Sequence, residues 1–305
     1  MLKRIRSILG QRRQFEVPPL PPVPTSSNSN AAGSAFAVTS SLHGHMLTYT
    51  RDRVIGESLR MSGGFAEQDI DLARRILAEL GITVDESLFL DIGANIGTHT
   101  IHALNSGFER AACIEPDPNN FKLLRINQIL NEVDDRCINI FAAASDRDGS
   151  GELEKSPTNF GDHRIRIRKG DATGIHAEEY WDTCQVRIGR LGSLIANAGL
   201  SLDNVGMVWI DTQGHEGHVF AGCPALLQSK IPVVSEFWPY GLDRSGGWPI
   251  FREALAASGR RIYDLRCPMI GAREPISVSE LEQLFSGMIA KETLSGSPHT
   301  DLLMI

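Results

Sequence analysis

The chain has no run of about 18 consecutive apolar residues, the length that a helix needs to cross a bilayer. The sequence therefore predicts no transmembrane segment. Cysteine is also scarce: the 305 residues include five cysteines, and no two of them form a C-x-x-C pair. An odd number of scattered cysteines argues against a disulfide framework or a zinc site. We expect most of these thiols to be small buried side chains in a reducing compartment, which indicates a cytoplasmic protein.

An excess of positive charge is missing as well. The formal net charge is −7, which argues against a protein whose main partner is nucleic acid and excludes no small substrate. The apolar fraction of 42% and the charged fraction of 22% are close to the globular average. We therefore expect a well-packed core, in one large domain or in one domain with an extension.

The N-terminal end differs in composition from the rest. Residues 1–13 are basic and weakly amphipathic, and they lack the apolar core of a secretory signal. Two interpretations are open for them, weak contact with an anionic membrane surface or a frayed, solvated terminus. Residues 18–35 are rich in proline and then in serine and asparagine, as a linker is. We expect a disordered segment over residues 1–35, an N-terminal cap over 36–85 and the main domain over 86–305, with an insertion at about 150–187.

The most informative stretch is F-L-D-I-G-A-N-I-G-T at residues 89–98. Residues 87–92 are a short apolar run with the length of a buried strand, and residues 96–106 have the pattern of a helix. Gly93 and Gly97 lie between them, where the backbone must turn tightly and approach something closely. A strand, a glycine loop and a helix N-terminus form a ligand pocket at the carboxyl end of the strand.

The spacing of this loop excludes two common nucleotide motifs. Counted from Gly93, the third and sixth positions are Asn95 and Thr98, so the dinucleotide pattern G-x-G-x-x-G fails. No lysine follows Gly97, so the phosphate-binding loop fails too. An acid, Asp91, stands at the end of the strand instead. A carboxylate there suits a ligand with a cationic group, such as the ammonium of an amino acid.

A second short strand at residues 111–115 ends in another acid, Glu115, 24 residues after Asp91. This is the usual place for a carboxylate that accepts hydrogen bonds from a ribose. Asp117 follows as an expected N-cap, with Pro118 at the first helical position. An acid for an ammonium, an acid for a ribose and glycines for close approach are together the chemistry that binds S-adenosylmethionine.

Four motifs then carry a family resemblance: F-L-D-I-G-A-N-I-G at 89–97, I-E-P-D-P at 114–118, A-A-A-S-D-R-D-G at 142–149 and W-I-D-T-Q-G-H-E-G-H-V-F-A-G at 209–222. The last fits the pattern D-x-[EQ]-G-x-E-x-x-[VL]-[LF]-x-G. The chain resembles the FkbM-type family of S-adenosylmethionine-dependent methyltransferases over roughly residues 60–240. The resemblance implies that the main domain is a methyltransferase domain with S-adenosylmethionine as its cofactor.

The fold expected from the pattern and the resemblance is α/β. Strands alternate with helices from residue 87 onward, which implies a parallel sheet with right-handed crossovers. The resemblance implies a Rossmann-like, seven-stranded class I methyltransferase sheet, mostly parallel with an antiparallel last strand and with helices on both faces. The expected strands cover residues 87–92, 111–115, 137–143, 207–211, 231–237, 260–265 and 301–305. Further strands are expected at 37–39 and 45–50 in the cap and at 152–155 and 163–168 in the insertion, with cap helix 67–80.

Nine residues are expected to bind the cofactor. Asp91 would hold the methionine end directly or through water, the loop from Gly93 to Gly97 would let the backbone close on it, and Glu115 would accept from the ribose hydroxyls. Ser145 or Asp146 could bond the adenine amine, or the turn that holds them is an ordinary polar turn. The full set is Asp91, Gly93, Asn95, Gly97, Thr98, Glu115, Asp117, Ser145 and Asp146.

The loop at residues 211–218 is the expected reacting edge. Methyl transfer depends mainly on alignment, and a base helps when the acceptor is an alcohol. His215 is the candidate base, with Asp211, Glu216 or Glu236 as orienting groups or alternative bases. Alternatives remain, since His215 could lie on the surface and Glu216 could only cap a helix. These groups could also hold a divalent metal, although their spacing is not diagnostic and we predict none.

The acceptor is less defined by the sequence. We expect O-methylation of a hydroxyl on a sugar, polysaccharide or secondary metabolite. N-methylation of a small molecule and a non-catalytic binding protein on the same fold are the alternatives. Arg164, Arg166 and Arg168 share one side of an expected strand, and they could bind an anionic acceptor or form a solvated face. His99 and His102 are expected to be packing or surface residues.

Overall fold

The computed structural model describes residues 35–166, 174–266, 274–293 and 296–305. The chain divides into residues 1–33 and residues 34–305, and the description below concerns the second unit. The predictions for the basic tail and for the linker up to residue 34 lie outside the described residues, as do those for Arg168 and Cys267.

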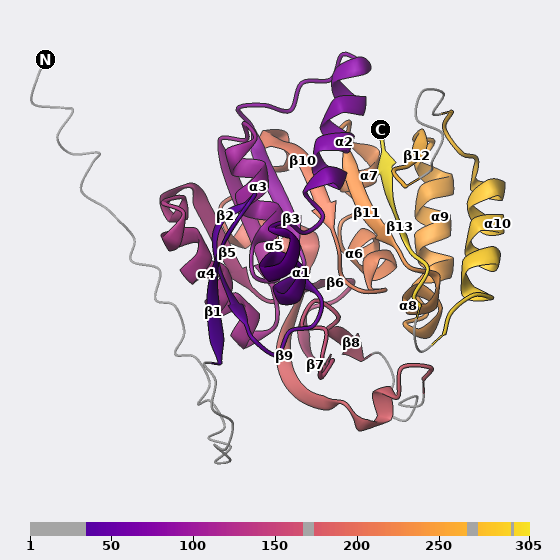
Figure 1. Ribbon diagram of the computed structural model, residues 1–305. Helices are drawn as coiled ribbons and strands as arrows, with labels where there is room; N and C mark the ends of the chain where they lie inside the picture. Colours follow the sequence, from indigo (N-terminus) through magenta and orange to yellow (C-terminus); the bar gives the residue numbers. More distant parts are fainter. Residues whose placement is uncertain (1–34, 167–173, 267–273, 294–295) are drawn as a thin grey trace, which may run out of the picture. The chain divides into compact units, whose positions relative to one another are not determined.

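The central element is a seven-stranded sheet with the strand order β12-β13-β11-β10-β3-β4-β5 (Figure 1). Strand β13 runs antiparallel to both neighbours, and the other pairs of neighbouring strands are parallel. The predicted α/β class, the seven strands and the antiparallel last strand are therefore confirmed. The strands are β3 (Leu88–Ile92), β4 (Arg110–Glu115), β5 (Cys137–Phe141), β10 (Val205–Ile210), β11 (Val233–Phe237), β12 (Ile262–Asp264) and β13 (Thr300–Met304).

Helices cover both faces of this sheet. Alternate residues of its strands belong to two separate apolar cores, one on each face. In β3, Leu88 and Leu90 belong to one core and Phe89 to the other. The core with Phe89 contains side chains of α1 (Ile55–Ser62), α2 (Glu67–Glu79), α3 (Thr98–Asn105) and α4 (Pro118–Leu130). The other core contains side chains of α5 (Leu191–Asn197), α6 (Glu216–Gly222), α7 (Pro224–Gln228), α8 (Pro239–Arg244), α9 (Trp248–Ser258) and α10 (Val278–Ile289).

The N-terminal part of the described chain forms a hairpin of β1 (Phe36–Ser41) and β2 (Gly44–Tyr49), followed by α1 and α2. The two predicted strands and the predicted helix are confirmed, whereas α1 was not predicted. Asparagine side chains in α4 and at its C-terminal end fix this hairpin. The backbone N–H of Leu47 donates to Asn127 at 2.7 Å, and that of His45 donates to Asn131 at 2.8 Å.

The predicted insertion and the residues that flank it form a second sheet of four strands in the order β6-β9-β7-β8. The expected third strand at 137–143 was too long, because β5 ends at Phe141 and the chain then enters this second sheet. Strand β9 was missed: its first half is largely exposed and lacks an apolar run to mark it. The strands are β6 (Ala143–Ser145), β7 (Gly149–Lys155), β8 (Arg164–Arg166) and β9 (Asp182–Arg190).

The structure bears on two expectations from composition, membrane-spanning helices and the state of the cysteines. Among the described residues, none of the helices has the length and apolar character to cross a membrane. The four cysteines in the described part are free thiols, namely Cys113, Cys137, Cys184 and Cys223.

Candidate active site

The glycine loop lies against the end of the neighbouring strand β10. Gly93 has φ of 90°, and a Cβ at this position would lie 1.8 Å from the backbone oxygen of Asp211. Only glycine accommodates both the left-handed backbone and this approach. The N–H groups of Gly93 and Ala94 both donate to the backbone oxygen of Ile114 on β4. The loop is thus held between the carboxyl ends of β10 and β4.

Three carboxylates lie in a row across the sheet beside this loop. Ile92 of β3 is paired with Ile210 of β10, which places Asp211 next to Gly93. Ile210 is paired with Ser235 of β11, so Glu236 follows at the level of Asp211. Glu236 is in turn paired with Asp301 of β13. Because neighbouring strands are about 4.8 Å apart, Asp211, Glu236 and Asp301 form a closely spaced row on one face.

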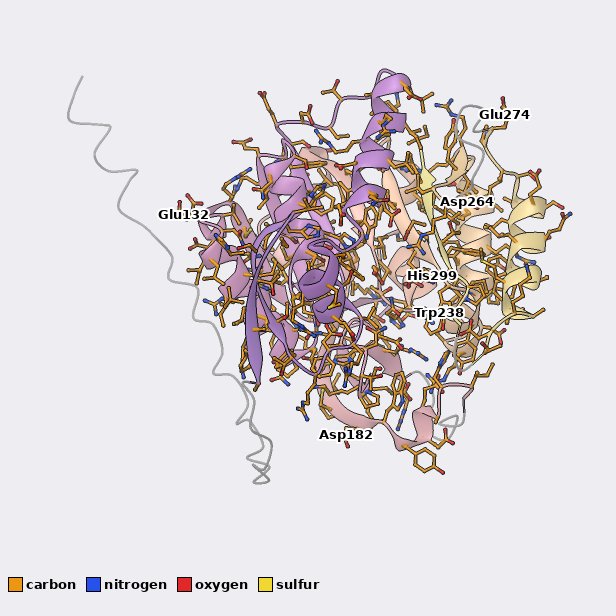
Figure 2. The ribbon with its side chains drawn as sticks, in the orientation of Figure 1. Glu132, Asp182, Trp238, Asp264, Glu274 and His299 are labelled. Atoms are coloured by element: carbon orange, nitrogen blue, oxygen red, sulfur yellow. The ribbon has the colours of Figure 1, made fainter. Side chains whose placement is uncertain are left out.

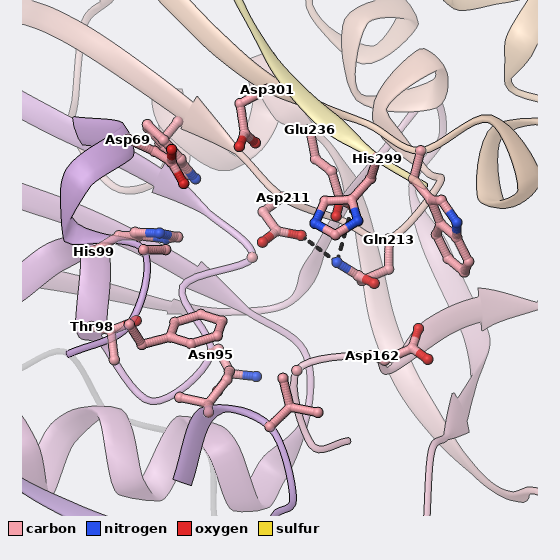
Figure 3. A pocket seen from close by; sticks show the side chains of 18 of the residues that line it. Asp69, Asn95, Thr98, His99, Asp162, Asp211, Gln213, Glu236, His299 and Asp301 are labelled. Atoms are coloured by element: carbon pink, nitrogen blue, oxygen red, sulfur yellow. Dashed lines mark hydrogen bonds between the residues drawn. The ribbon is translucent and has the colours of Figure 1, made fainter. Parts of the chain in front are cut away.

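A cavity of about 420 Å³ opens over this row (Figure 3). Its volume is in the range of small-molecule sites. Strand ends of the main sheet, the start of α3, the cap segment and the segment 159–162 of the insertion contribute to its wall. Five carboxylates line it, namely Asp69, Asp162, Asp211, Glu236 and Asp301. Figure 2 places Trp238 and His299, two further lining residues, among the crowded side chains around these strands.

A smaller cavity of about 40 Å³ adjoins the first on the side of β4. Glu115 lines it together with apolar side chains, among them Leu153 and Ile165 of the insertion. The two cavities have five lining residues in common, namely Gly93, Asn95, Gly161, Asp211 and Gln213. The two cavities therefore lie side by side along the glycine loop, and the smaller one is the more apolar.

Glu115 is fixed by the backbone at the start of this smaller cavity. Its Oε2 accepts from the N–H of Asn95 at 2.9 Å, and its Oε1 accepts from the N–H of Asp117 at 2.7 Å. Asn95 adopts φ of 50°, which brings its N–H toward the acid. Burial raises the pKa of Glu115 to about 8, and the charge of Asp117 adds to this shift. The carboxyl is therefore rigid and close to its titration point at neutral pH.

Asp91 lies within β3, two residues before Gly93. It is fully buried, and its Oδ2 accepts from the Thr100 hydroxyl of α3 at 2.5 Å. Burial raises its pKa to about 7. As far as the described residues go, Oδ1 has no partner and Asp91 does not belong to the lining of either cavity. This geometry does not favour direct contact between Asp91 and a ligand, because α3 covers the carboxylate.

The other expected cofactor residues divide into two groups. Asn95 and Thr98 line the larger cavity. Asp117 is the N-cap of α4, as predicted, and accepts from the N–H groups of two residues in its first turn at 2.9 Å. Lys155 also pairs with Asp117 at 2.8 Å, so this carboxylate is already occupied.

Ser145 and Asp146 bond histidines of the loop 211–218. The Ser145 hydroxyl lies 3.0 Å from Nε2 of His215, and Asp146 lies 2.9 Å from Nδ1 of His218. Within the described structure, neither Ser145 nor Asp146 lines the two cavities. Their expected role at the adenine is not favoured by this placement.

The loop 211–218 is organised by two side chains. Oε1 of Glu216 accepts from the N–H and the hydroxyl of Thr212, both at 2.9 Å, and from the N–H of Gly214 at 3.1 Å. The amide Nε2 of Gln213 donates to Asp211 at 2.6 Å and to Glu236 at 3.0 Å (Figure 3). Glu216 thus holds the loop, whereas Gln213 joins the two carboxylates that face the cavity.

Burial raises the pKa of both joined carboxylates. For Glu236 the charge of Asp211 raises the pKa further, so the value lies well above that of an ordinary glutamate. A carboxylate with a raised pKa is a competent base near neutral pH. Asp211 and Glu236 face the cavity and bind a proton more readily than ordinary carboxylates, so both stay candidates for the base.

His215 has different properties. It is 2% exposed, lies parallel to His218 with ring centroids 4.5 Å apart, and contributes to the wall of the smaller cavity. Burial lowers its pKa to about 3, and His218 adds to the shift. A histidine with this pKa is a weak base, so the geometry favours a structural role over the expected catalytic one.

The arginine row of the insertion is paired within the chain. Arg164 donates to both oxygens of Asp162 at 2.6 and 2.7 Å and to Glu178 at 2.6 Å, and it lies over Trp238 at 4.4 Å. Arg166 donates to Glu154 at 2.6 Å. These guanidinium groups are neither a solvated face nor free to bind an anionic acceptor. Arg164 instead orients Asp162 in the cavity wall.

Several lining residues were missed in the sequence, among them Asp69, Asp162, His299 and Asp301. They stand alone in segments without a motif, so no local pattern marks them. His99, expected to be a packing or surface residue, does pack on Trp209 but also lines the cavity. The described residues contain no group of three or more His, Cys, Asp or Glu side chains arranged to hold a metal ion.

Solved structures with similarity to the chain are distant. Methyltransferase FkbM from Methylobacillus flagellatus KT is 13% identical with a TM-score of 0.42, over 73% of this chain and 44% of that one. The chain thus matches less than half the length of that protein. The O-methyltransferase from Bacillus cereus in complex with SAH is 14% identical with a TM-score of 0.41, over 82% and 85% of the two chains. Similarities this low carry no inference about activity.

No curated protein is significantly similar to the chain. The family described as "Methyltransferase FkbM domain", in contrast, matches residues 91–256, which is more than half of the 305 residues. The matched region contains the glycine loop, Glu115 and the loop 211–218. The chain belongs to the FkbM family of methyltransferases.

Proposed function

We propose that this protein transfers the methyl group of S-adenosylmethionine to a hydroxyl of a sugar, a polysaccharide or a secondary metabolite. The observation that carries the proposal is the pair of joined cavities at the carboxyl ends of β3, β4 and β10. The smaller one offers a fixed carboxylate and apolar walls, and the larger one offers a row of carboxylates. This is the place where open α/β sheets bind ligands.

The donor would lie across the glycine loop. Glu115 would accept from the ribose hydroxyls, with the adenine between the apolar residues of the smaller cavity. The amino-acid end would enter the larger cavity past Gly93, Asn95 and Thr98. When bound, S-adenosylmethionine supplies a methyl group activated by a positively charged sulfur. Asp91 would act indirectly, by supporting the start of α3 through Thr100.

The acceptor would occupy the part of the larger cavity near Asp162, Glu236 and Trp238. Alignment in this closed space supplies most of the rate of methyl transfer. Asp211 or Glu236 would take the proton of the reacting hydroxyl, and Gln213 would hold the two carboxylates in position. Glu216 would position the loop, and His215 would support it from below.

The carboxylate-rich wall also bears on the alternatives. It gives no support to an anionic acceptor, because five carboxylates line the cavity and the cations near it are already paired. Arg266 of the wall is paired with Asp69 and Asp301, and the described arginines of the insertion are paired as well. A cationic amine is compatible with the same wall, so N-methylation is the second candidate. A cytoplasmic location and a site that works without a metal remain predictions.

Incubation of the protein with S-adenosylmethionine labelled on the methyl group, together with glycan and metabolite extracts, tests the proposal. We expect label on oxygen in a hydroxyl-rich product, and Asp211→Asn should reduce incorporation far more than His215→Ala. Label found only on nitrogen would reject O-methylation. Binding of S-adenosylhomocysteine without any incorporation across a range of extracts would favour a non-catalytic protein.

A further inference from the structure

Two buried nitrogen atoms in the wall of the larger cavity lack a hydrogen-bond partner among the described residues. They are Nε1 of Trp209 on β10 and Nε2 of His99 on α3. Trp209 is 2% exposed and His99 is 7% exposed, and their ring centroids are 4.7 Å apart. An indole N–H can only donate, and buried donors are rarely left unpaired in folded proteins. Both atoms therefore point to a missing acceptor in the cavity.

His99, like Trp209, can donate a hydrogen bond from its ring. Burial lowers the pKa of His99 to about 3, so its ring is neutral and Nε2 can carry the ring proton. Thr98, the first residue of α3, lines the same cavity, and no side chain from the described chain caps this helix. The first backbone N–H groups of an α-helix favour a negatively charged partner. Donors of three kinds thus surround one side of the cavity.

Carboxylates stand close to these donors. Figure 3 shows His99, Thr98 and Asp69 on one side of Asp211, and Asp162 and His299 on the other. A simple anion would satisfy the donors but meet the carboxylates, because Arg266, a cation in the same wall, is already paired with Asp69 and Asp301. A ligand with an ammonium and a carboxylate on one carbon satisfies both groups at once. The amino-acid end of the methyl donor is such a ligand.

We propose that Trp209 and His99 bind the α-carboxylate of the methyl donor, while the neighbouring carboxylates of the cavity wall face its α-ammonium. This inference rests on the donor placement proposed above and assigns roles that the motif residues do not cover. It also explains how the amino-acid end is held although Asp91 is covered by α3. Trp209 and His99 are therefore specificity residues that distinguish the full donor from ligands without an amino-acid end.

Calorimetric titration of the full chain with two ligands tests this assignment. S-adenosylhomocysteine carries the amino-acid end, whereas 5′-methylthioadenosine retains the adenosine and the sulfur without it. Trp209→Phe keeps the ring but removes the donor, and we expect it to weaken S-adenosylhomocysteine binding by about tenfold or more. The affinity for 5′-methylthioadenosine should stay unchanged. Trp248→Phe is the matched control, because Trp248 stacks on Phe285 at 4.1 Å and is not among the lining residues.

A second measurement does not depend on the folding of the Trp209 variant. The chain has four tryptophans, so the indole N–H signals of ¹⁵N-labelled protein can be assigned from Phe variants of Trp181, Trp238 and Trp248. S-adenosylhomocysteine should shift the remaining signal, that of Trp209, downfield, and 5′-methylthioadenosine should not.

Equal effects of the two ligands, in affinity or in this shift, would overturn the assignment and leave the donor site itself in place. A wild-type protein that binds neither ligand would overturn the proposed function as well.

Discussion

The raised pKa of Glu115 predicts a specific dependence of stability on pH. The folded-state pKa is about 8 and the ordinary value is 4.5, so between these values the folded state holds a proton that the unfolded state has released. This proton stabilises the folded state over that interval, and the stabilisation is lost as the pH rises through about 8. The perturbation that isolates it is Glu115→Gln, which removes the titrating group and keeps the shape.

The magnitude follows from the two pKa values. At about pH 6.5 the Glu115 proton stabilises the folded state by about 2 kcal/mol, and at about pH 8.5 by only a few tenths of a kcal/mol. The other carboxyl groups with raised pKa values are present in both proteins, so their contributions to the pH dependence of stability cancel in the comparison. The buried histidines are the same in both proteins, so their titration cancels in the comparison as well. The wild-type free energy of unfolding should therefore fall by about 2 kcal/mol more than that of Glu115→Gln.

Urea denaturation of both proteins without ligand, at about pH 6.5, 7.5 and 8.5, measures this difference. The variant also loses one acceptor for the N–H groups of Asn95 and Asp117, so its absolute stability is not the test. Only the change with pH is compared. Parallel pH dependences in the two proteins would refute the raised pKa and, with it, the description of Glu115 as a buried carboxyl near its titration point.

Proton release on ligand binding is a second way to measure the raised pKa of Glu115. Ribose hydroxyls that donate to Glu115 favour its charged form, so binding of S-adenosylhomocysteine near pH 7 should release a fraction of a proton. Calorimetry in buffers with different ionisation enthalpies detects this release. The release should disappear in Glu115→Gln, and its persistence there would assign the proton to another group.

Three further predictions concern the loop and the insertion. Gly93→Ala should abolish donor binding, because its Cβ would lie 1.8 Å from a backbone oxygen. Gly199→Ala is the control: Gly199 also has a positive φ but has open space around it, so the variant should lose only about 1 kcal/mol of stability. Binding and melting curves of both variants separate the steric clash from the cost of the positive φ. Glu216→Gln should lower kcat with little change in donor affinity, since it loosens the loop by weakening its charged hydrogen bonds; kinetics and calorimetry together check this. Arg164→Leu should leave the fully buried Glu178 and the half-buried Asp162 without this cation and destabilise the fold by about 3 kcal/mol, as measured by urea denaturation. A loss within about 0.5 kcal/mol would show that these ion pairs are not needed.

The predictions that succeeded depend on local patterns. The strand, the glycine loop and the acid at Glu115 follow each other along the chain, and strand length and acid spacing place them at one sheet edge. Asp117 as an N-cap followed from the proline after it. The seven strands and the antiparallel last strand came from alternation together with the family resemblance. In each case the decisive contacts lie within a few residues or between neighbouring strands.

Asp91 and His215 show where this reasoning stops. The sequence places Asp91 at the strand end, but it does not reveal that the Thr100 hydroxyl and α3 cover its carboxylate. His215 has an ordinary local pattern, and its pKa is lowered by burial and by the neighbouring His218, which the motif does not reveal. The roles of Asp91 and His215 depend on burial and on contacts with residues outside their motifs, which the motifs do not reveal.

The larger cavity could not be foreseen for a related reason. Asp69, Asp162 and Asp301 come from the cap, the insertion and the last strand, which the fold brings together over long distances in sequence. Asp301 meets Glu236 only because β13 enters antiparallel beside β11 in one register. A shift of one residue would turn Asp301 to the other face. The carboxylate row is thus a property of the sheet as a whole.

The most direct test of the account is a crystal structure of the protein with S-adenosylhomocysteine. We expect the ribose hydroxyls within hydrogen-bond distance of Glu115, the adenine against Leu153 and Ile165, and the amino-acid end in the larger cavity beside Trp209. A ligand bound away from Glu115 and the glycine loop would contradict the central claim that the two joined cavities form one donor site.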